Sequence, residues 1–202
     1  MLKTGENELV LASASVSRAT LLKNAGLSFR IQSSNIDESV IKASCKQKGE
    51  TAMHAAMRLA EAKGKAVSAN DGELVLAGDQ ILSCDGAWYD KPKDLQTAAD
   101  NLSALQDRTH YLETAACLIQ KGRIVERFES RPALTMRPLS NAFIDNYLKT
   151  IGDKALSSVG GYQLEGSGLQ LFSSVKGDYF SILGLPMLDI LHALRARGLL
   201  SI

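Results

Sequence analysis

Residues 73–92 read ELVLAGDQILSCDGAWYDKP, and they decide the fold expected of this chain. The apolar run Leu74–Ala77 predicts a buried strand. Beyond its far end comes Asp79, a carboxylate that is costly to bury without a partner. Asp85-Gly86 is a dipeptide that often closes a two-residue hairpin, so the chain is expected to turn back and bring Lys91 toward Asp79. A carboxylate and an ammonium would then lie together, either as a surface salt bridge or as part of a site.

The composition is that of an ordinary globular protein, with 45% hydrophobic and 22% charged residues. A chain of 202 residues can bury a sizeable core, and no repeat or linker divides it. One domain is therefore predicted over residues 1–202. The formal net charge of +1 gives no reason to expect a nucleic acid polymer as partner, so any attraction to phosphate must be local.

Cysteine usage and the N-terminus bear on the compartment. Three cysteines (Cys45, Cys84 and Cys117) lie far apart with no CxxC pair, which favours a reducing compartment over a disulfide framework or a thiolate zinc site. The N-terminal residues MLKTGENE have no apolar core of a signal peptide, and the longest apolar run is far short of a membrane span. A cytoplasmic protein with no membrane partner is expected.

A hydroxyl-rich loop follows the strand predicted over Leu9–Ala12 and leads into a helix. It contains Ser13, Ser15 and Ser17, and Arg18 comes next. The free N–H groups of a first helical turn, together with a guanidinium, suit a phosphate oxygen. Ser15 or Ser17 could instead serve only as a helix cap, and the loop lacks the GxxxxGK[ST] spacing of a Walker loop.

Further charged residues follow along the chain. Asp37-Glu38 is expected in a loop after the strand predicted over 29–33, where adjacent acids face opposite ways, so that at most one points into a cleft. Lys63 lies at the edge of the apolar stripe of a helix predicted over 51–68. A lysine at such an edge could simply extend its stem over apolar surface.

Other elements are predicted from periodicity and turn residues. The segment 160–168 has four glycines around Glu165, which fits backbone close to a ligand or a run of tight turns. The remaining predictions are a helix over 95–105, a long antiparallel hairpin over 109–120 and 124–135, a helix over 141–150 capped by Ser140, a strand over 169–175 and a last helix from about 186 to 197.

Most residues suited to chemistry fall at strand ends, where open α/β sheets bind ligands. Cations with hydroxyls imply a phosphate ligand, and two spare carboxylates imply a hard divalent metal such as Mg²⁺. Three histidines (His54, His110 and His192) fall on different elements without an HExxH pattern and are given structural roles. These residues predict a metal-assisted phosphate-ester or phosphoanhydride enzyme. A kinase is disfavoured because no Walker or kinase glycine loop is present.

The order of motifs resembles that of the Maf-like nucleoside triphosphate pyrophosphatases. They read LASASVSRATLL, IDES, LAEAK, GDQ, DG, DKP, GGYQLEGSG and GDYFSILGLP. The family pattern begins LASxSPRRxxLL, and here Val16 and Ser17 replace the proline and the first arginine. The resemblance implies an α/β fold whose elongated mixed sheet is flanked by helices, with a cleft between two lobes. It also implies hydrolysis of a nucleoside triphosphate to the monophosphate and pyrophosphate with Mg²⁺ or Mn²⁺.

The resemblance further implies a role for each site residue. Glu38 and Asp79 would hold the metal, and Asp79 would act as general base on the attacking water. Ser13 and the loop after it would hydrogen-bond to phosphate oxygens. Three cations would neutralise the triphosphate and the departing pyrophosphate: Arg18, Lys63 and Lys91.

Three positions bear on the accepted base: Ser17, Gln80 and Glu165. The subgroup acting on dTTP and UTP has arginine, threonine and glutamine there, whereas the 7-methyl-GTP subgroup has tryptophan, glutamine and glutamate. This chain is similar to the second at two of the three. A carboxylate at Glu165 suits the donor edge of guanine. The resemblance thus favours 7-methyl-GTP or a related purine nucleotide, with a dTTP/UTP-type or broad-specificity enzyme as the alternative.

A rival from another class is a nucleotide-binding regulator of cell division that does not hydrolyse its ligand. The presence of both Glu38 and Asp79 favours the enzyme, because pure binding gains little from a second carboxylate facing phosphate charges. Relatives also suggest a homodimer, although no residue pattern in this chain demands one.

Overall fold

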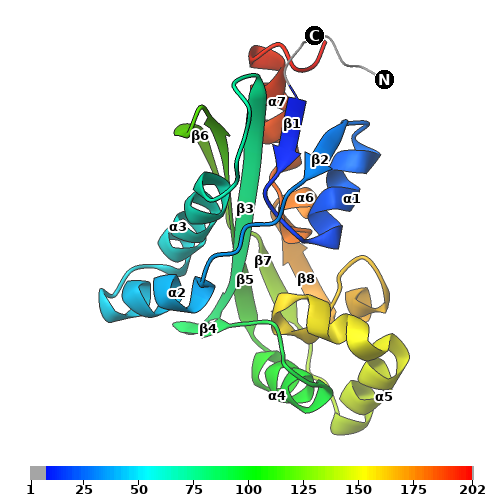
Figure 1. Cartoon of the computed structure of the whole chain (residues 1–202). Helices are drawn as coiled ribbons and strands as arrows, with labels where there is room; N and C mark the ends of the chain where they lie inside the picture. The colour runs from blue at the N-terminus through cyan, green and yellow to red at the C-terminus, as the bar shows by residue number, and fades with distance from the viewer. Residues whose placement is uncertain (1–7, 202) are drawn as a thin grey trace. The chain divides into compact units, whose positions relative to one another are not determined.

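The computed structural model describes residues 8–201 (Figure 1). Segment 1–7, on which the prediction of no signal peptide chiefly depends, lies outside the described residues. The described residues form eight strands: β1 Glu8–Leu11, β2 Phe29–Ile31, β3 Glu73–Cys84, β4 Ala87–Tyr89, β5 Thr109–Gln120, β6 Arg123–Ser130, β7 Ala133–Met136 and β8 Phe172–Lys176. The same part of the chain contains seven α-helices: α1 Val16–Asn24, α2 Glu38–Gln47, α3 Ala52–Lys65, α4 Leu95–Leu105, α5 Asn141–Ile151, α6 Tyr179–Ile182 and α7 Met187–Ala196.

The strands form one mixed sheet in the order β2-β1-β3-β5-β7-β8, with β4 paired to β3 and β6 paired to β5. The predicted α/β class, a mixed sheet flanked by helices, is confirmed. The chain divides into two compact units. The first contains the described residues up to Gln80, Thr114–Ser130 and the residues from Asp178 onward, and the second contains Ile81–Glu113 and Arg131–Gly177. The single domain predicted over 1–202 stays a prediction.

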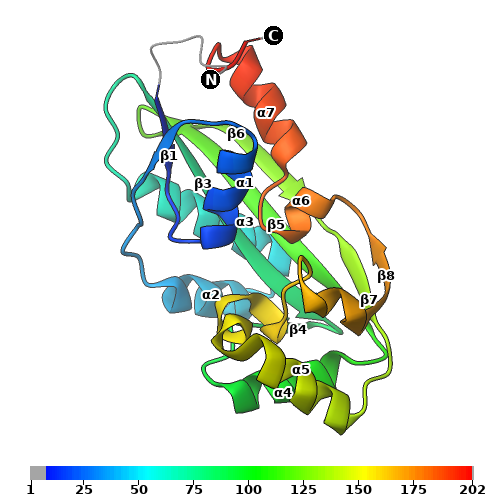
Figure 2. The ribbon, with the colours of Figure 1, turned by 90° about the vertical axis from the view of Figure 1, so that its right-hand side faces the viewer.

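In the first unit, β1 lies between β2 and β3 and is parallel to both (Figure 1). The apolar residues of these strands share a core with α1 and α7, in which Leu11, Leu22 and Ile190 are fully buried. α7 packs against β6 (Figure 2), where Arg197 forms an ion pair of 2.5 Å with Glu126.

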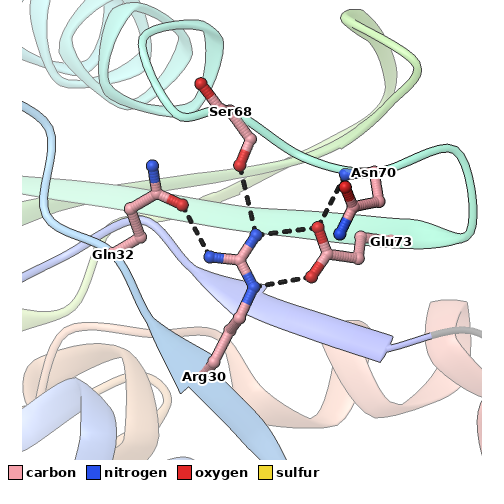
Figure 3. A network of polar contacts seen from close by, with 5 residues as sticks. All are labelled: Arg30, Gln32, Ser68, Asn70 and Glu73. Atoms are coloured by element: carbon pink, nitrogen blue, oxygen red, sulfur yellow. Dashed lines mark hydrogen bonds and ion pairs between the residues drawn. The ribbon is translucent and has the colours of Figure 1, made fainter.

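A polar network fixes the start of β3 to β2 (Figure 3). Arg30 binds both carboxylate oxygens of Glu73, at 2.6 and 2.7 Å, and also donates to Gln32 Oε1 and the Ser68 carbonyl. The Asn70 N–H donates to the same carboxylate at 2.7 Å. The hydrogen bond from Arg30, followed by that from Asn70, lowers the pKa of Glu73 to about 2.

In the second unit, β3 and β4 form the predicted hairpin, with Leu82 opposite Tyr89. Asp85 (φ 48°) and Gly86 (φ 82°) make its turn, and positive φ at both positions is what a two-residue type I′ turn requires. α4 and α5 lie side by side (Figures 1 and 2).

Buried aromatic residues join β5 to the glycine-rich segment of this unit. His110 is fully buried and its Nε2 lies 2.7 Å from the Tyr162 hydroxyl. The ring of Phe172 packs against both. His110 Nδ1 is buried without a hydrogen-bond partner, and burial lowers the pKa of this histidine from 6.5 to about 4.

Three predictions of local structure were wrong. The strand predicted over 124–135 is two strands, β6 and β7, because Pro132 lies between them and has no N–H to donate to the ladder. The loop predicted at Asp37-Glu38 is instead the start of α2. Residues 169–171, predicted as strand, belong to the 3₁₀ turn Ser167–Leu171. The short helix α6 was not predicted.

Within residues 8–201, every helix is too short or too polar to cross a membrane.

Candidate functional site

Two carboxylates and one ammonium meet in the first unit. Lys63 Nζ lies 2.5 Å from Asp79 Oδ1 and 2.8 Å from Glu38 Oε1. The Asp79 and Lys63 side chains are 9% and 12% exposed, whereas Glu38 is 43% exposed. Lys63 therefore does not end in solvent, and it joins α2, α3 and β3 at one point.

The end of α2 directs one of the two adjacent acids toward Lys63. The Asp37 carboxylate caps the helix by accepting from the Ser39 N–H at 3.0 Å and from the Ser39 hydroxyl at 2.6 Å. These bonds lower the pKa of Asp37. Glu38, in the first helical turn, contacts Lys63. Of the adjacent acids Asp37 and Glu38, only Glu38 is thus seen to contact the lysine, while Asp37 caps the helix.

A glycine lets α3 approach the sheet. A Cβ on Gly64 would lie 2.5 Å from Ile119 Cδ1 and 3.0 Å from Ala77 Cβ. A methyl group at this position would require the Ile119 side chain to shift and would press on Ala77. Because Gly64 follows Lys63 directly, the close approach of the helix brings the ammonium within reach of Asp79.

Asp79 lies inside a strand and not at the end of one, which corrects the expected strand end at Ala77. β3 runs on to Cys84. The neighbouring strand β1 ends at Leu11, opposite Leu76, so Asp79 extends past the carboxyl end of β1. It still occupies the edge at which α/β sheets bind ligands.

Arg18 is buried close to these carboxylates. Its Nε donates to the Gly184 carbonyl at 2.9 Å, and its NH1 donates to Ser13 Oγ at 3.3 Å. Burial lowers the pKa of Arg18, while Asp79 and Glu38 act in the opposite direction. A buried guanidinium beside two carboxylates leaves the first unit with two cations and two anions in one region.

The serines of the loop between β1 and α1 have different roles in the structure. Ser15 caps α1 by accepting from the Arg18 N–H at 3.4 Å, and Ser13 Oγ accepts from the Ser15 N–H at 3.2 Å. Ser17 lies partly buried in the first turn of α1. The cap therefore belongs to Ser15, and the loop is held by its own hydroxyls.

Gln80, predicted as a substrate contact, is engaged with the protein. Its Nε2 donates to Thr114 Oγ1 at 2.8 Å and to the carbonyls of Ser181 and Ile182 at 2.9 and 3.3 Å. Thr114, Ser181 and Gly184 were missed by the sequence analysis. Ser181 and Gly184 lie in the GDYFSILGLP motif, which carries no indication of what its backbone would contact, and Thr114 lies outside that motif, on β5.

Lys91 and Glu165 belong to the second unit. Both are exposed; Lys91 follows β4 and Glu165 lies in the glycine-rich segment. The roles that the resemblance gives them stay predictions.

The donor set suits a hard divalent ion. Glu38 Oε1 and Asp79 Oδ1 both contact the same cationic group, which shows that their oxygens can converge on one positive charge. Mg²⁺ commonly takes one or two protein carboxylates and completes its shell with water and phosphate oxygens. No cluster of three His, Cys, Asp or Glu side chains suited to a metal is found in the described part of the chain.

Comparison with known proteins gives a consistent set of relatives. The family described as Maf-like protein matches residues 8–197. The 7-methyl-GTP pyrophosphatase of Rhizobium meliloti (strain 1021) is 46% identical over 191 residues, which cover 94% of this chain and 96% of the relative. The nucleoside triphosphate pyrophosphatase of Rhodospirillum rubrum is 45% identical over 193 residues, which cover 95% of this chain and 96% of that relative. The 7-methyl-GTP pyrophosphatase of Brucella abortus biovar 1 is 44% identical over 189 residues, which cover 93% of this chain and 95% of that relative.

Proposed function

This chain belongs to the Maf-like family, and from that premise we propose that it hydrolyses a nucleoside triphosphate to the monophosphate and pyrophosphate. The observation that carries the proposal is the contact of Glu38 and Asp79 with Lys63, beside the buried Arg18. A polyphosphate needs cations to neutralise it, and its hydrolysis needs a carboxylate to activate water. Both kinds of group are present in the first unit.

We assign the roles as follows. Asp79 accepts the proton of the water that attacks the α-phosphorus. Arg18 donates N–H groups to phosphate oxygens, and Lys63 neutralises charge on the leaving pyrophosphate. Glu38 and Asp79 would hold Mg²⁺ or Mn²⁺, which when bound would neutralise further negative charge on the phosphates.

For the base, we propose 7-methyl-GTP or a related purine nucleotide. Two of the relatives reported above are named 7-methyl-GTP pyrophosphatase. Glu165 is exposed, and a carboxylate can accept from the N–H groups of guanine. Gln80 contributes differently from a direct base contact, because its amide nitrogen already donates within the protein.

The first test is release of pyrophosphate from 7-methyl-GTP, GTP, dTTP and UTP with Mg²⁺, with Mn²⁺ and with EDTA. We expect turnover of the purine nucleotides with metal and none with EDTA. Turnover of dTTP and UTP with 7-methyl-GTP inert would overturn the proposed base preference. Full activity in EDTA would overturn the proposed requirement for a divalent metal.

The second test concerns the base that activates water. Asp79→Asn removes the proton acceptor but keeps the side-chain shape, so the rate should fall about 10² to 10⁴-fold. Asp100→Asn, at an exposed position on α4, serves as the matched control and should keep the parent rate. Pyrophosphate release by Asp79→Asn at the parent rate would contradict the assignment.

A third test isolates the specificity residue. Glu165→Gln keeps the size of the side chain and removes its charge. We expect a loss of preference for 7-methyl-GTP over unmodified GTP, because methylation at N7 gives the base a positive charge that a carboxylate attracts and an amide does not; the measurement is the ratio of kcat/KM values. An unchanged ratio would show that Glu165 does not select the base.

A further inference from the structure

We infer that Thr114, together with Gln80, is a positioning residue for Arg18. The two side chains hold the Ser181 carbonyl, and through it they hold the Gly184 backbone that receives the Arg18 guanidinium. The inference rests on the proposed function, in which Arg18 binds phosphate oxygens.

The Ser181 carbonyl is the centre of this arrangement. It accepts from Gln80 Nε2 at 2.9 Å, from Thr114 Oγ1 at 2.9 Å and from the Gly184 N–H at 3.0 Å. A carbonyl oxygen has two lone pairs, so three donors saturate it. Thr114 and Ser181 are both fully buried, so their hydrogen bond is shielded from solvent.

The segment that carries this carbonyl depends on such anchors. α6 has only four residues, too few to be stable by its own backbone bonds. Its amino end is capped by Asp178, which accepts from the Ser181 N–H at 2.8 Å and from the Ser181 hydroxyl at 2.5 Å. Its carboxyl end is held where Gln80 and Thr114 bind the Ser181 carbonyl. Loss of either donor would loosen the turn that leads to Gly184.

Gly184 in turn sets the position of Arg18. The Gly184 carbonyl accepts from Arg18 Nε, and the Gly184 N–H donates to Ser181, so one residue joins both contacts. Its φ of +113° and the 3.2 Å between a built Cβ and Arg18 Nε require glycine at this point. A Cβ on Gly78 would lie 3.5 Å from the same Nε. The arginine side chain therefore passes between two glycine backbones.

The fixed Nε and NH1 contacts define the plane of the guanidinium, which has five N–H donors in a rigid fork. The donors not used in these two bonds can meet phosphate oxygens. A shift of Gly184 would rotate this fork, and a small misplacement of a binding group is enough to reduce a rate.

The test compares Thr114→Val, which removes the hydroxyl at nearly constant shape, with Thr114→Ser, which keeps it. With 7-methyl-GTP and Mg²⁺, we expect kcat/KM to fall about tenfold in Thr114→Val, which loses the hydrogen bonds of the hydroxyl to Ser181 and Gln80, and to recover in Thr114→Ser. Thr135→Val is the matched control: it removes a hydrogen bond of 2.9 Å between the hydroxyls of Thr109 on β5 and Thr135 on β7, and it should leave kcat/KM within about twofold of the parent.

A double-mutant cycle separates positioning from general weakening. If Thr114 acts through Arg18, Thr114→Val should have almost no further effect in the Arg18→Lys background, because the fork is already absent. Effects that multiply, or parent activity in Thr114→Val, would overturn the inference. Gln80→Met, which keeps length but has no donor, should behave as Thr114→Val does, and it replaces that variant if the latter fails to fold.

The inference can fail separately from the proposed function. If the parent releases no pyrophosphate from any nucleotide, the proposed function is wrong, and the same variants are compared by calorimetric binding of pyrophosphate with Mg²⁺. Binding up to about tenfold weaker in Thr114→Val, and no weaker in the double variant than in Arg18→Lys, still supports positioning. Equal binding by parent and Thr114→Val overturns it.

Discussion

Lys63 shows how one side chain can make an acidic site stable. Two carboxylates near one another would raise the energy of the folded chain, and Asp79 is almost buried. The ammonium placed between them compensates both charges, at 2.5 and 2.8 Å. From the sequence, the helical stripe places Lys63 at the edge of the apolar face. The partners of Lys63 could not be derived from that pattern, because they depend on how closely α3 packs on the sheet.

His110 makes stability depend on pH. Burial lowers its pKa from 6.5 to about 4, so below pH 6.5 the unfolded chain takes up a proton that the folded chain does not. Stability is fully present above about pH 6.5 and is lost progressively toward pH 4. The shift corresponds to about 3 kcal/mol over that range.

We expect His110→Gln to flatten this pH dependence, because glutamine does not titrate but can still hydrogen-bond to Tyr162. Urea unfolding at pH 7, 5.5 and 4.5 measures the free energy of unfolding for parent and variant. His192→Gln, at an exposed position on α7, is the control and should keep the slope of the parent. The same slope in His110→Gln would show that this histidine is not the group responsible.

At the scale of elements, close packing of α3 decides whether the charged groups meet. In Gly64→Ala the new methyl meets Ile119 Cδ1 and Ala77 Cβ, and overpacking costs about 1 to 3 kcal/mol. The gain in helix propensity offsets about 1 kcal/mol. A net destabilisation of about 1 kcal/mol is expected, with reduced activity because α3 moves Lys63 away from Asp79.

The matched background is Ile119→Val, which deletes the closest atom. In that background Gly64→Ala should cost less than in the parent, measured by urea unfolding and by pyrophosphate release. Strictly additive costs would indicate that the contact with Ile119 does not limit the approach of the helix.

Local signals predicted several elements well. The Asp85-Gly86 turn, the Ser140 cap and the helix over 95–105 follow from residues close in the sequence. α2 and α6 were missed for a common reason. Each buries too few residues to show a long apolar stripe: Cys45 in α2, and Ser181 and Ile182 in the four residues of α6. Both helices begin at a capping aspartate, and α6 is also held by a distant contact with Gln80.

At the scale of the molecule, ligand binding should be visible in thermal stability. Net charge of +1 provides no general attraction for a polyphosphate, so affinity must come from the local cations. With Mg²⁺ and the α,β-methylene analogue of GTP at about 100 times its Kd, the folded state gains about 2.7 kcal/mol. For a chain of this size we expect Tm to rise by about 5 to 10 °C.

The same shift should be lost in Arg18→Gln and reduced by EDTA, measured by calorimetry at fixed protein concentration. Thr135→Val serves again as the control and should keep the full rise. An undiminished rise in Arg18→Gln would show that the buried guanidinium takes no part in binding.

The family and the class of fold could be predicted from the order of motifs along the whole chain, whereas the bonding pattern around Arg18 could not. Ser181 and Gly184 are far from Arg18 in the sequence, and their contribution comes from backbone atoms that every residue possesses. Glycine at 184 indicates an unusual backbone conformation, but neither residue type indicates which side chain the carbonyl would accept from.

Along β3, Asp79 faces Lys63 while Gln80 faces Ser181, since successive side chains of a strand point to opposite sides. Removing or adding one codon upstream of Asp79 within this strand would turn the acid to the opposite face of the sheet, away from Lys63. Two codons would restore the orientation, although displaced along the sheet. The face on which Asp79 lies therefore depends on the number of residues that separate it from the paired start of β3, and a single added residue keeps that face only where a β-bulge takes it up.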